Sequence, residues 1–163
     1  MEQIHAVRLF EHHSPSVTHR EYTAGMSSVR SAKKQILIID DSPTVCAVAE
    51  LALRQEGYST RAFADGIAAM KWLLRSESWS PDLAIVDIGL PKMDGYEVIR
   101  HLKANPRLAN VVCITLSARD GTVDQLKGKL VGAQMCLIKP CPVQVLCRAA
   151  RACLIGSSGA RAE

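Results

Sequence analysis

Short apolar runs alternate with amphipathic segments from residue 35 to about residue 155. Four of the runs are almost continuously apolar, which is typical of strands buried on both faces of a parallel sheet. These four runs are residues 36–39, 83–86, 111–116 and 135–138. A fifth run, at residues 58–63, mixes polar and apolar side chains and suits an edge strand. The pattern therefore predicts five short strands.

The segments between the strands repeat their apolar residues with a helical period. The first predicted helix has Ser42 as its cap and Pro43 in its first turn, and Gly57 ends it. Four further helices are predicted at residues 65–75, 94–105, 123–131 and 142–155. The fourth helix is the weakest, because Gly128 lies inside it. The apolar stripes expected to face the sheet are Val45, Val48, Ala49, Ala52 and Leu53, then Ile67, Met70, Leu73 and Leu74, then Val98, Ile99 and Leu102.

Five strands alternating with five helices predict a doubly wound α/β fold, with helices on both faces of a five-stranded parallel sheet. We expect this domain to span residues 35–155. Residues 1–34 hold four of the five histidines and no sustained apolar period, so they are predicted to be a flexible N-terminal extension. Residues 156–163 are rich in Gly, Ser and Ala, and we expect a disordered tail.

Composition narrows the class of protein. The chain is 48% hydrophobic and 22% charged, as expected of one globular domain. It contains no apolar stretch of the roughly 18 to 20 residues that a membrane span needs, so we expect no membrane span and a cytoplasmic location. The net charge of +4 is scattered, and no nucleic-acid partner is expected. The six cysteines form no CxxC pair and are predicted to be buried thiols in a reducing compartment.

Polar residues follow four of the predicted strands. Asp40 and Asp41 end the first strand, Asp87 the third, Ser117 the fourth and Lys139 the fifth. In a doubly wound sheet, ligands bind beyond the carboxyl ends of the strands, where the strand order reverses. With the order 2-1-3-4-5, strands one and three would be neighbours, and all five side chains would converge on one rim.

The residue types at this rim suit phosphoryl chemistry. Close carboxylates repel one another, and Mg²⁺ would relieve the repulsion because it prefers oxygen ligands. Asp41 and Asp87 would bind the ion, and Asp40 could hold one of its waters. A lysine ammonium and a serine hydroxyl would then suit the oxygens of a phosphoryl group in transfer to Asp87. Taken singly, each residue has an ordinary explanation, such as a helix cap or a surface lysine; the combination favours a site.

Four segments together carry a resemblance to a known family. They are residues 36–42 (ILIIDDS), 86–95 (VDIGLPKMDG), 116–118 (LSA) and 137–140 (LIKP). Over residues 35–155 the chain resembles the receiver domain of bacterial two-component response regulators, which implies a flavodoxin-like (CheY-like) sheet of order 2-1-3-4-5.

The resemblance also implies roles for individual residues. Asp87 would be the phosphoacceptor, Ser117 and Lys139 would contact the phosphoryl oxygens, and Asp40 and Asp41 would be the acidic pair for magnesium. The carbonyl of Gly89 would complete the metal shell beside Asp87. The bond between Lys139 and Pro140 would be cis. The phosphodonor would be a histidine kinase or a phosphotransfer protein.

A narrower resemblance concerns residues 121–140, which are similar to single-domain regulators of type IV pilus twitching motility. Only eight residues follow Ile155, too few for an output domain, so we expect signalling through contact with a downstream effector protein. The chain departs from the receiver pattern at Cys136, where an aromatic residue is usual on the fifth strand, and at Cys141. A thiol cannot act as a swinging ring, so the usual coupling is predicted to be weakened or rerouted.

Three functions compete on this evidence. The first is a phosphorylatable signalling receiver, which is not an enzyme beyond its own phosphorylation and dephosphorylation. The second is an adaptor that keeps the acidic pocket but signals without phosphorylation, with Cys136 as its support. The third is a magnesium phosphohydrolase that forms an aspartyl phosphate. Such an enzyme would carry a second acid two residues after Asp87, where this chain has Gly89, so the third function is disfavoured.

Overall fold

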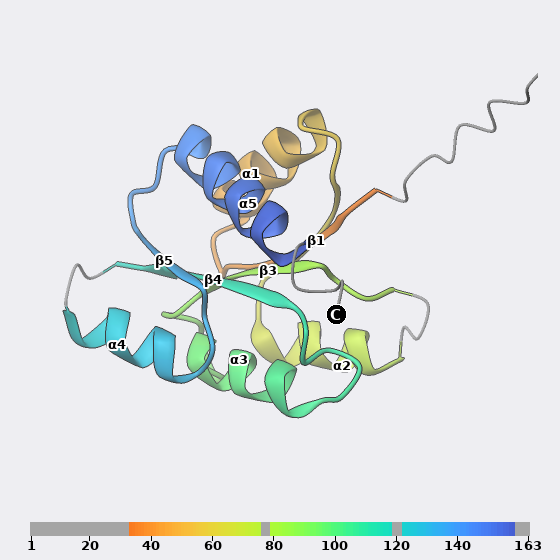
Figure 1. The fold of residues 1–163 in the computed structure, drawn as a ribbon. Coiled ribbons are helices and arrows are strands. Elements are labelled where there is room, and N and C mark those ends of the chain that lie inside the picture. The colour runs from red at the N-terminus through yellow and green to blue at the C-terminus, as the bar shows by residue number, and fades with distance from the viewer. Residues whose placement is uncertain (1–32, 76–78, 119–121, 159–163) are drawn as a thin grey trace, which may run out of the picture. The chain divides into compact units, whose positions relative to one another are not determined.

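The computed structural model describes residues 33–75, 79–118 and 122–158, in which strands and helices alternate regularly (Figure 1). The strands are β1 (Gln35–Ile39), β2 (Ser59–Phe63), β3 (Leu83–Asp87), β4 (Val112–Ser117) and β5 (Met135–Ile138). The helices are α1 (Pro43–Gln55), α2 (Gly66–Arg75), α3 (Gly95–Ala104), α4 (Thr122–Leu130) and α5 (Val143–Ser158). The predicted flexible extension, apart from residues 33 and 34, and residues 159–163 of the predicted tail lie outside the described residues.

The five strands form one parallel sheet in the order β2-β1-β3-β4-β5. This is the order predicted from the sequence, and β1 and β3 are neighbours as expected. Helices α1 and α5 lie on one face of the sheet, and α2, α3 and α4 lie on the other (Figure 1). The mixed segment predicted as an edge strand is β2, which lies at an edge of the sheet.

Two hydrophobic clusters, one on each face, hold these layers together. Alternate residues of a strand belong to opposite clusters, because side chains along a strand point alternately to the two faces. Ile36 and Ile38 join the cluster that includes α1 and α5 residues, whereas Leu37 and Ile39 join the cluster with α2 and α3. Each of these four side chains is almost fully buried and stabilises the fold by roughly 1.5 to 3 kcal/mol relative to an exposed one.

Not every predicted core position is buried. Val98, Ile99 and Leu102 are completely buried on α3, as predicted, but Val48 on α1 and Leu74 on α2 are 49% and 58% exposed. The prediction that Val48 and Leu74 face the sheet was wrong, because the sheet covers a narrower stripe of each helix than the apolar residues occupy. Strand β5 was also predicted to be buried on both faces, yet its residues are half-buried or exposed, since β5 is the second edge of the sheet.

The ends of the domain differ slightly from the prediction. Lys34, expected in the flexible extension, forms an ion pair with Asp82 at 2.9 Å, and its carbonyl accepts the backbone N–H of Ser59. Helix α5 continues to Ser158, three residues beyond the predicted boundary, so residues 156–158 of the predicted tail are helical. The predicted cap of α1 is present, since Ser42 Oγ accepts the N–H of Val45.

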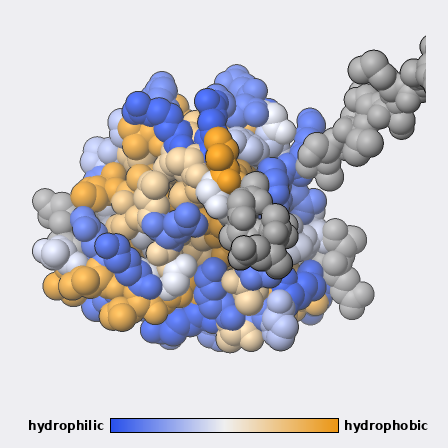
Figure 2. Space-filling view, in the orientation of Figure 1, coloured by the Kyte–Doolittle hydropathy of each residue, from blue (hydrophilic) through white to orange (hydrophobic). Residues whose placement is uncertain are grey.

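Helix α4 presents apolar side chains to solvent. Val123, Leu126 and Leu130 are 61%, 57% and 85% exposed, and Figure 2 shows hydrophobic surface along the edge of the molecule where α4 lies. Gly128 is the buried residue of this helix, so the glycine that weakened the helical prediction faces the sheet. Within the described ranges, no helix combines the length and apolar character needed to cross a bilayer.

Candidate functional site

Three aspartates meet at the carboxyl ends of two neighbouring strands. Asp87 is the last residue of β3, and Asp40 and Asp41 directly follow β1. One carboxylate oxygen from each residue lies within 4.8 Å of the others. Asp40 is fully buried and Asp87 is 6% exposed, whereas Asp41 is open to solvent. The structure thus brings together the acids that the sequence placed at one rim.

Lys139 faces this cluster from the end of β5. Its Nζ donates a hydrogen bond of 2.9 Å to Asp87 Oδ2 and lies 2.7 Å from Asp40 Oδ2. The Lys139 ammonium therefore bridges the two buried acids. Burial lowers the pKa of Lys139, but the nearby Asp40 and Asp87 carboxylates outweigh burial and raise it above its usual value. The ammonium is therefore charged at neutral pH.

The charges of this group do not balance. Three ionised carboxylates carry three negative charges and Lys139 supplies one positive charge, which leaves two uncompensated negative charges in a partly buried space. A single divalent cation would neutralise them, and oxygen-only ligands suit a hard ion such as Mg²⁺. The donor set of three carboxylates therefore fits a magnesium ion.

Backbone groups fix the two buried acids. The N–H of Ser42 donates to Asp40 Oδ1 at 2.9 Å, and the N–H of Gly89 donates to Asp87 Oδ1 at 3.0 Å. Gly95, at the start of α3, lies directly against the backbone of Asp87, since a Cβ there would be 2.2 Å from the Asp87 carbonyl oxygen. The glycine in the MDG segment thus lets α3 begin beside the strand end that carries Asp87.

A pocket of about 500 Å³ opens beside Asp87. Its lining residues come from the ends of β3, β4 and β5 and from α3 and α4, and include Asp87, Gly89, Tyr96, Ser117, Asp124 and Lys139. Ser117 is 2% exposed, and its hydroxyl donates to Asp124 Oδ2 at 3.1 Å. Asp87, Ser117 and Lys139 of the sequence-predicted side chains line this pocket. Asp40 and Asp41 are not among its lining residues, but their carboxylates lie close to that of Asp87.

Tyr96 and Asp124 line the pocket but were missed by the sequence analysis. The Tyr96 hydroxyl donates to Asp124 Oδ1 at 3.1 Å, and the tyrosine ring is buried. Burial, followed by the hydrogen bond to Asp124, raises the pKa of Tyr96 to about 12. A buried tyrosine generally needs a hydroxyl partner, which was an available signal for Tyr96, but the identity of a partner 28 residues away required the fold.

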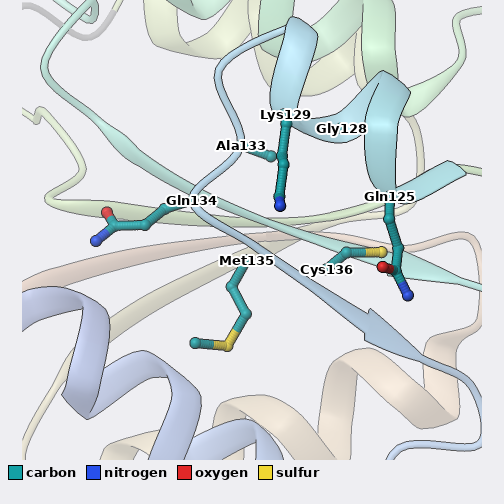
Figure 3. A pocket seen from close by; sticks show the side chains of 7 residues that line it. All are labelled: Gln125, Gly128, Lys129, Ala133, Gln134, Met135 and Cys136. Atoms are coloured by element: carbon teal, nitrogen blue, oxygen red, sulfur yellow. The ribbon is translucent and has the colours of Figure 1, made fainter. Parts of the chain in front are cut away.

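Cys136, the residue where the sequence departs from the receiver pattern, lies on β5. Cys136 is half-buried and borders a pocket of about 260 Å³ between α4 and β5. Figure 3 shows Cys136 together with Gln125 and Lys129 of α4 around this pocket. The small Cys136 thiol therefore borders open space between α4 and β5. The Lys139–Pro140 bond is cis, as the resemblance implied.

All six cysteines have free thiols. Cys113, Cys147 and Cys153 are buried, whereas Cys46, Cys136 and Cys141 are half-buried, so the prediction of buried thiols was right for three of the six.

Comparisons with known proteins agree with this fold. The family model described as "Response regulator receiver domain" matches residues 36–151. The chain is 34% identical over 106 residues to Protein PilG of Pseudomonas aeruginosa, covering 65% of this chain and 76% of that protein. It is 32% identical over 120 residues to the DNA-binding dual master transcriptional regulator RpaA of Synechocystis, covering 74% of this chain but 48% of RpaA. The chain thus spans about half the length of that regulator.

A similar solved structure is that of a putative response regulator from Chloroflexus aurantiacus, with a TM-score of 0.69 and 30% identity. The alignment covers 76% of this chain and 98% of that one. The matched family model, the strand order and the acidic cluster at the ends of β1 and β3 lead to one conclusion: the chain belongs to the response regulator receiver family of two-component signalling proteins.

Proposed function

We propose that Asp87 accepts a phosphoryl group from a histidine kinase or a phosphotransfer protein, and that the phosphorylated domain signals by contact with a downstream effector protein. The strongest support is the convergence of Asp40, Asp41, Asp87 and Lys139 beside one open pocket. An isolated aspartate at a strand end would be an ordinary cap. Three acids and one ammonium beside a space of this size suit a reaction in which charge moves onto a phosphoryl group.

In the transfer, a carboxylate oxygen of Asp87 attacks the phosphorus atom of a phosphohistidine. A P–O bond to Asp87 forms, the P–N bond to the imidazole breaks, and its electron pair stays on the ring nitrogen. Lys139, held against Asp87 at 2.9 Å, neutralises part of the charge on the phosphoryl oxygens. The hydroxyl of Ser117 can donate to one of those oxygens once it leaves Asp124.

The proposed metal ligands are Asp41, Asp87 and the carbonyl of Gly89, with Asp40 holding a water of the metal shell. Bound Mg²⁺ supplies charge neutralisation for the incoming phosphoryl oxygens. The two uncompensated negative charges of the cluster support this assignment. Removing Asp41 by Asp41→Ala should weaken Mg²⁺ binding, measured by titration calorimetry, with little effect on thermal stability because this side chain is exposed.

The test of phosphorylation uses acetyl phosphate and Mg²⁺. Mass spectrometry should show the gain of one phosphoryl group in the wild type and none in Asp87→Ala. Asp94→Asn is the matched control, since Asp94 caps α3 through its side chain and asparagine is an equally good cap. A wild type that gains no mass, or an Asp87→Ala protein that gains as much as the wild type, would contradict the proposal.

The same experiment separates the competing functions. A phosphorylation-independent adaptor would gain no mass. A phosphohydrolase would turn over added phosphoesters. Gly89 argues against this function, because it offers no second acid beside Asp87. Receiver domains are signalling domains rather than enzymes that act on separate substrates.

The pathway follows less directly from the site. The resemblance of residues 121–140 to twitching-motility regulators and the similarity to Protein PilG support a place in type IV pilus signalling. Deletion of the encoding gene should reduce the size of twitching zones. Complementation with the wild-type gene should restore them, and complementation with Asp87→Ala should not. Unchanged twitching in the deletion would exclude this pathway and leave the phosphorylation chemistry unaffected.

A further inference from the structure

Asp124 places a carboxylate in the pocket beside the proposed phosphoacceptor. It lies in the first turn of α4 and lines the same pocket as Asp87, Ser117 and Lys139. A phosphoryl group on Asp87 would bring further negative charge into this pocket. Two anionic groups sharing a partly buried space repel each other, so the position of Asp124 opposes the phosphorylated state.

The contacts of Asp124 also engage Ser117. The Ser117 hydroxyl donates to Asp124 Oδ2 at 3.1 Å, and a hydroxyl has one proton to donate. While this bond is formed, Ser117 cannot donate the same proton to an oxygen of a phosphoryl group on Asp87. Phosphorylation therefore sets Asp124 and the phosphoryl group in competition for one donor.

A second contact ties Asp124 to α3. The buried Tyr96 hydroxyl donates to Asp124 Oδ1 at 3.1 Å and lies 3.3 Å from the backbone oxygen of the same residue. Asp124 thus joins the first turn of α4 both to the end of β4 and to α3. The rest of α4 is loosely held, since its buried residue is Gly128 and its large apolar side chains are exposed.

We infer that Asp124 is a positioning residue that latches the unphosphorylated state: it holds the Ser117 hydroxyl away from Asp87 and pins the start of α4 to Tyr96. A phosphoryl group on Asp87 takes the proton of Ser117 and repels the Asp124 carboxylate. Asp124 then leaves the pocket, the bond to Tyr96 breaks, and the first turn of α4 is released. Since this latch acts only if Asp87 is phosphorylated, it rests on the proposed function.

The latch predicts that removing the charge of Asp124 favours the phosphorylated state. Beryllofluoride with Mg²⁺ serves as a stable mimic of the phosphoryl group, and its binding is measured by ¹⁹F NMR. Asp124→Asn should bind beryllofluoride about tenfold more tightly than the wild type, because a charge-assisted hydrogen bond and a repulsion no longer oppose binding. Glu97→Gln is the matched control, since it removes a carboxylate from α3 that does not line the pocket, and its affinity should equal that of the wild type.

The tyrosine hydroxyl gives a readout that a purely structural role would not move. The chain has three tyrosines, and in protein labelled with ¹³C at tyrosine Cζ the signal absent from Tyr96→Phe belongs to Tyr96. In the wild type this signal should shift when beryllofluoride binds, because the hydroxyl loses its carboxylate acceptor. In Asp124→Ala the signal of the unliganded protein should already lie near that shifted position.

The outcomes separate the two proposals. If the wild type and Asp124→Asn bind beryllofluoride with equal affinity and the Tyr96 signal does not move, the latch is wrong and the phosphoacceptor site stands. If no variant binds beryllofluoride in the presence of Mg²⁺ and none is phosphorylated by acetyl phosphate, the proposed function fails and the latch fails with it. Thermal unfolding of each variant verifies that a change in affinity does not reflect loss of the fold.

Discussion

At the level of single residues, Gly89 leaves the space beside Asp87, the proposed phosphoacceptor, without a side chain. A Cβ at Gly89 would lie 3.7 Å from Asp87 Oδ1, an ordinary contact distance, so the position accepts a side chain without strain. In Gly89→Leu we expect the phosphorylated state to last several times longer than in the wild type, because the side chain excludes attacking water. The decay of the phosphorylated protein, followed after removal of acetyl phosphate, measures this lifetime.

Gly89→Ala is the control for this prediction, since a methyl group adds little cover. Its lifetime should lie between those of the wild type and Gly89→Leu. Equal lifetimes in all three proteins would show that water does not reach the phosphoryl group from this side.

Two glycines at helical positions should respond oppositely to alanine. A Cβ at Gly95 would lie 2.2 Å from the backbone oxygen of Asp87, whereas a Cβ at Gly128 would be 3.6 Å from Thr115 Oγ1. Gly95→Ala should lower the free energy of unfolding by about 1 to 3 kcal/mol through overpacking. Gly128→Ala should raise it by about 0.5 to 1 kcal/mol, because alanine favours the helix.

Urea unfolding measures both changes, and each variant serves as the other's control for the effect of an added methyl group. Phosphorylation of Gly95→Ala should also fall, since α3 must move away from the backbone of Asp87. A Gly95→Ala protein as stable as the wild type would mean that α3 can begin farther from the strand end than the structure has it.

At the level of elements, helix α4 covers a polar atom that it does not satisfy. Thr115 on β4 is completely buried, and its Oγ1 has no hydrogen-bond partner among the described residues. Burying a hydroxyl without a partner costs roughly 1 to 3 kcal/mol. We therefore expect Thr115→Val, which keeps the shape and removes the hydroxyl, to raise the free energy of unfolding by about 1 kcal/mol.

Thr122→Val is the control, because Thr122 is exposed at the start of α4. The free energy of unfolding of this variant should remain within about 0.5 kcal/mol of the wild-type value. A loss of stability in Thr115→Val would indicate that the hydroxyl has a partner, such as an ordered water. Gly128 lies directly over this hydroxyl, so Thr115→Val also tests how closely α4 packs on the sheet.

The elements were predictable from the sequence because a parallel sheet is buried on both faces. Continuous apolar runs marked β1, β3 and β4, and caps such as Ser42 marked the helix starts. The same pattern overestimated burial at Val48, at Leu74 and along β5, because periodicity does not tell how far neighbouring elements extend over a face or which strand ends the sheet.

The candidate site was also predictable only in part. Asp40, Asp41, Asp87 and Lys139 could be grouped in advance, since each follows a strand and parallel strands end at one rim. Asp124 could not, because its contact with Tyr96 depends on how α4 is rotated against α3. From the sequence alone, an acidic residue in the first turn of a helix is explained by its favourable interaction with the helix dipole.

For the molecule as a whole, the buried and half-buried thiols predict how stability depends on pH. Burial raises the pKa of Cys113 from 9.0 to about 11, and burial also raises the pKa of Cys46, Cys141, Cys147 and Cys153. A raised pKa means that the folded protein disfavours the thiolate, whereas the unfolded chain ionises at the usual value. The contribution of each thiol is therefore complete below that value and is lost as the pH rises through the folded pKa.

Cys113 allows this loss to be measured, because it is completely buried in the cluster that α2 and α3 share with the sheet. With a pKa of about 11 in the folded state and 9.0 in the unfolded chain, its contribution should fall by about 1 kcal/mol between about pH 8 and pH 10. Cys113→Val removes the titrating group and keeps an apolar side chain. Urea unfolding under reducing conditions measures the free energy of unfolding at each pH. Between about pH 8 and pH 10 it should fall by about 1 kcal/mol more in the wild type than in the variant. Parallel curves would mean that Cys113 ionises in the folded protein at its ordinary pKa, which requires water to reach the centre of the sheet.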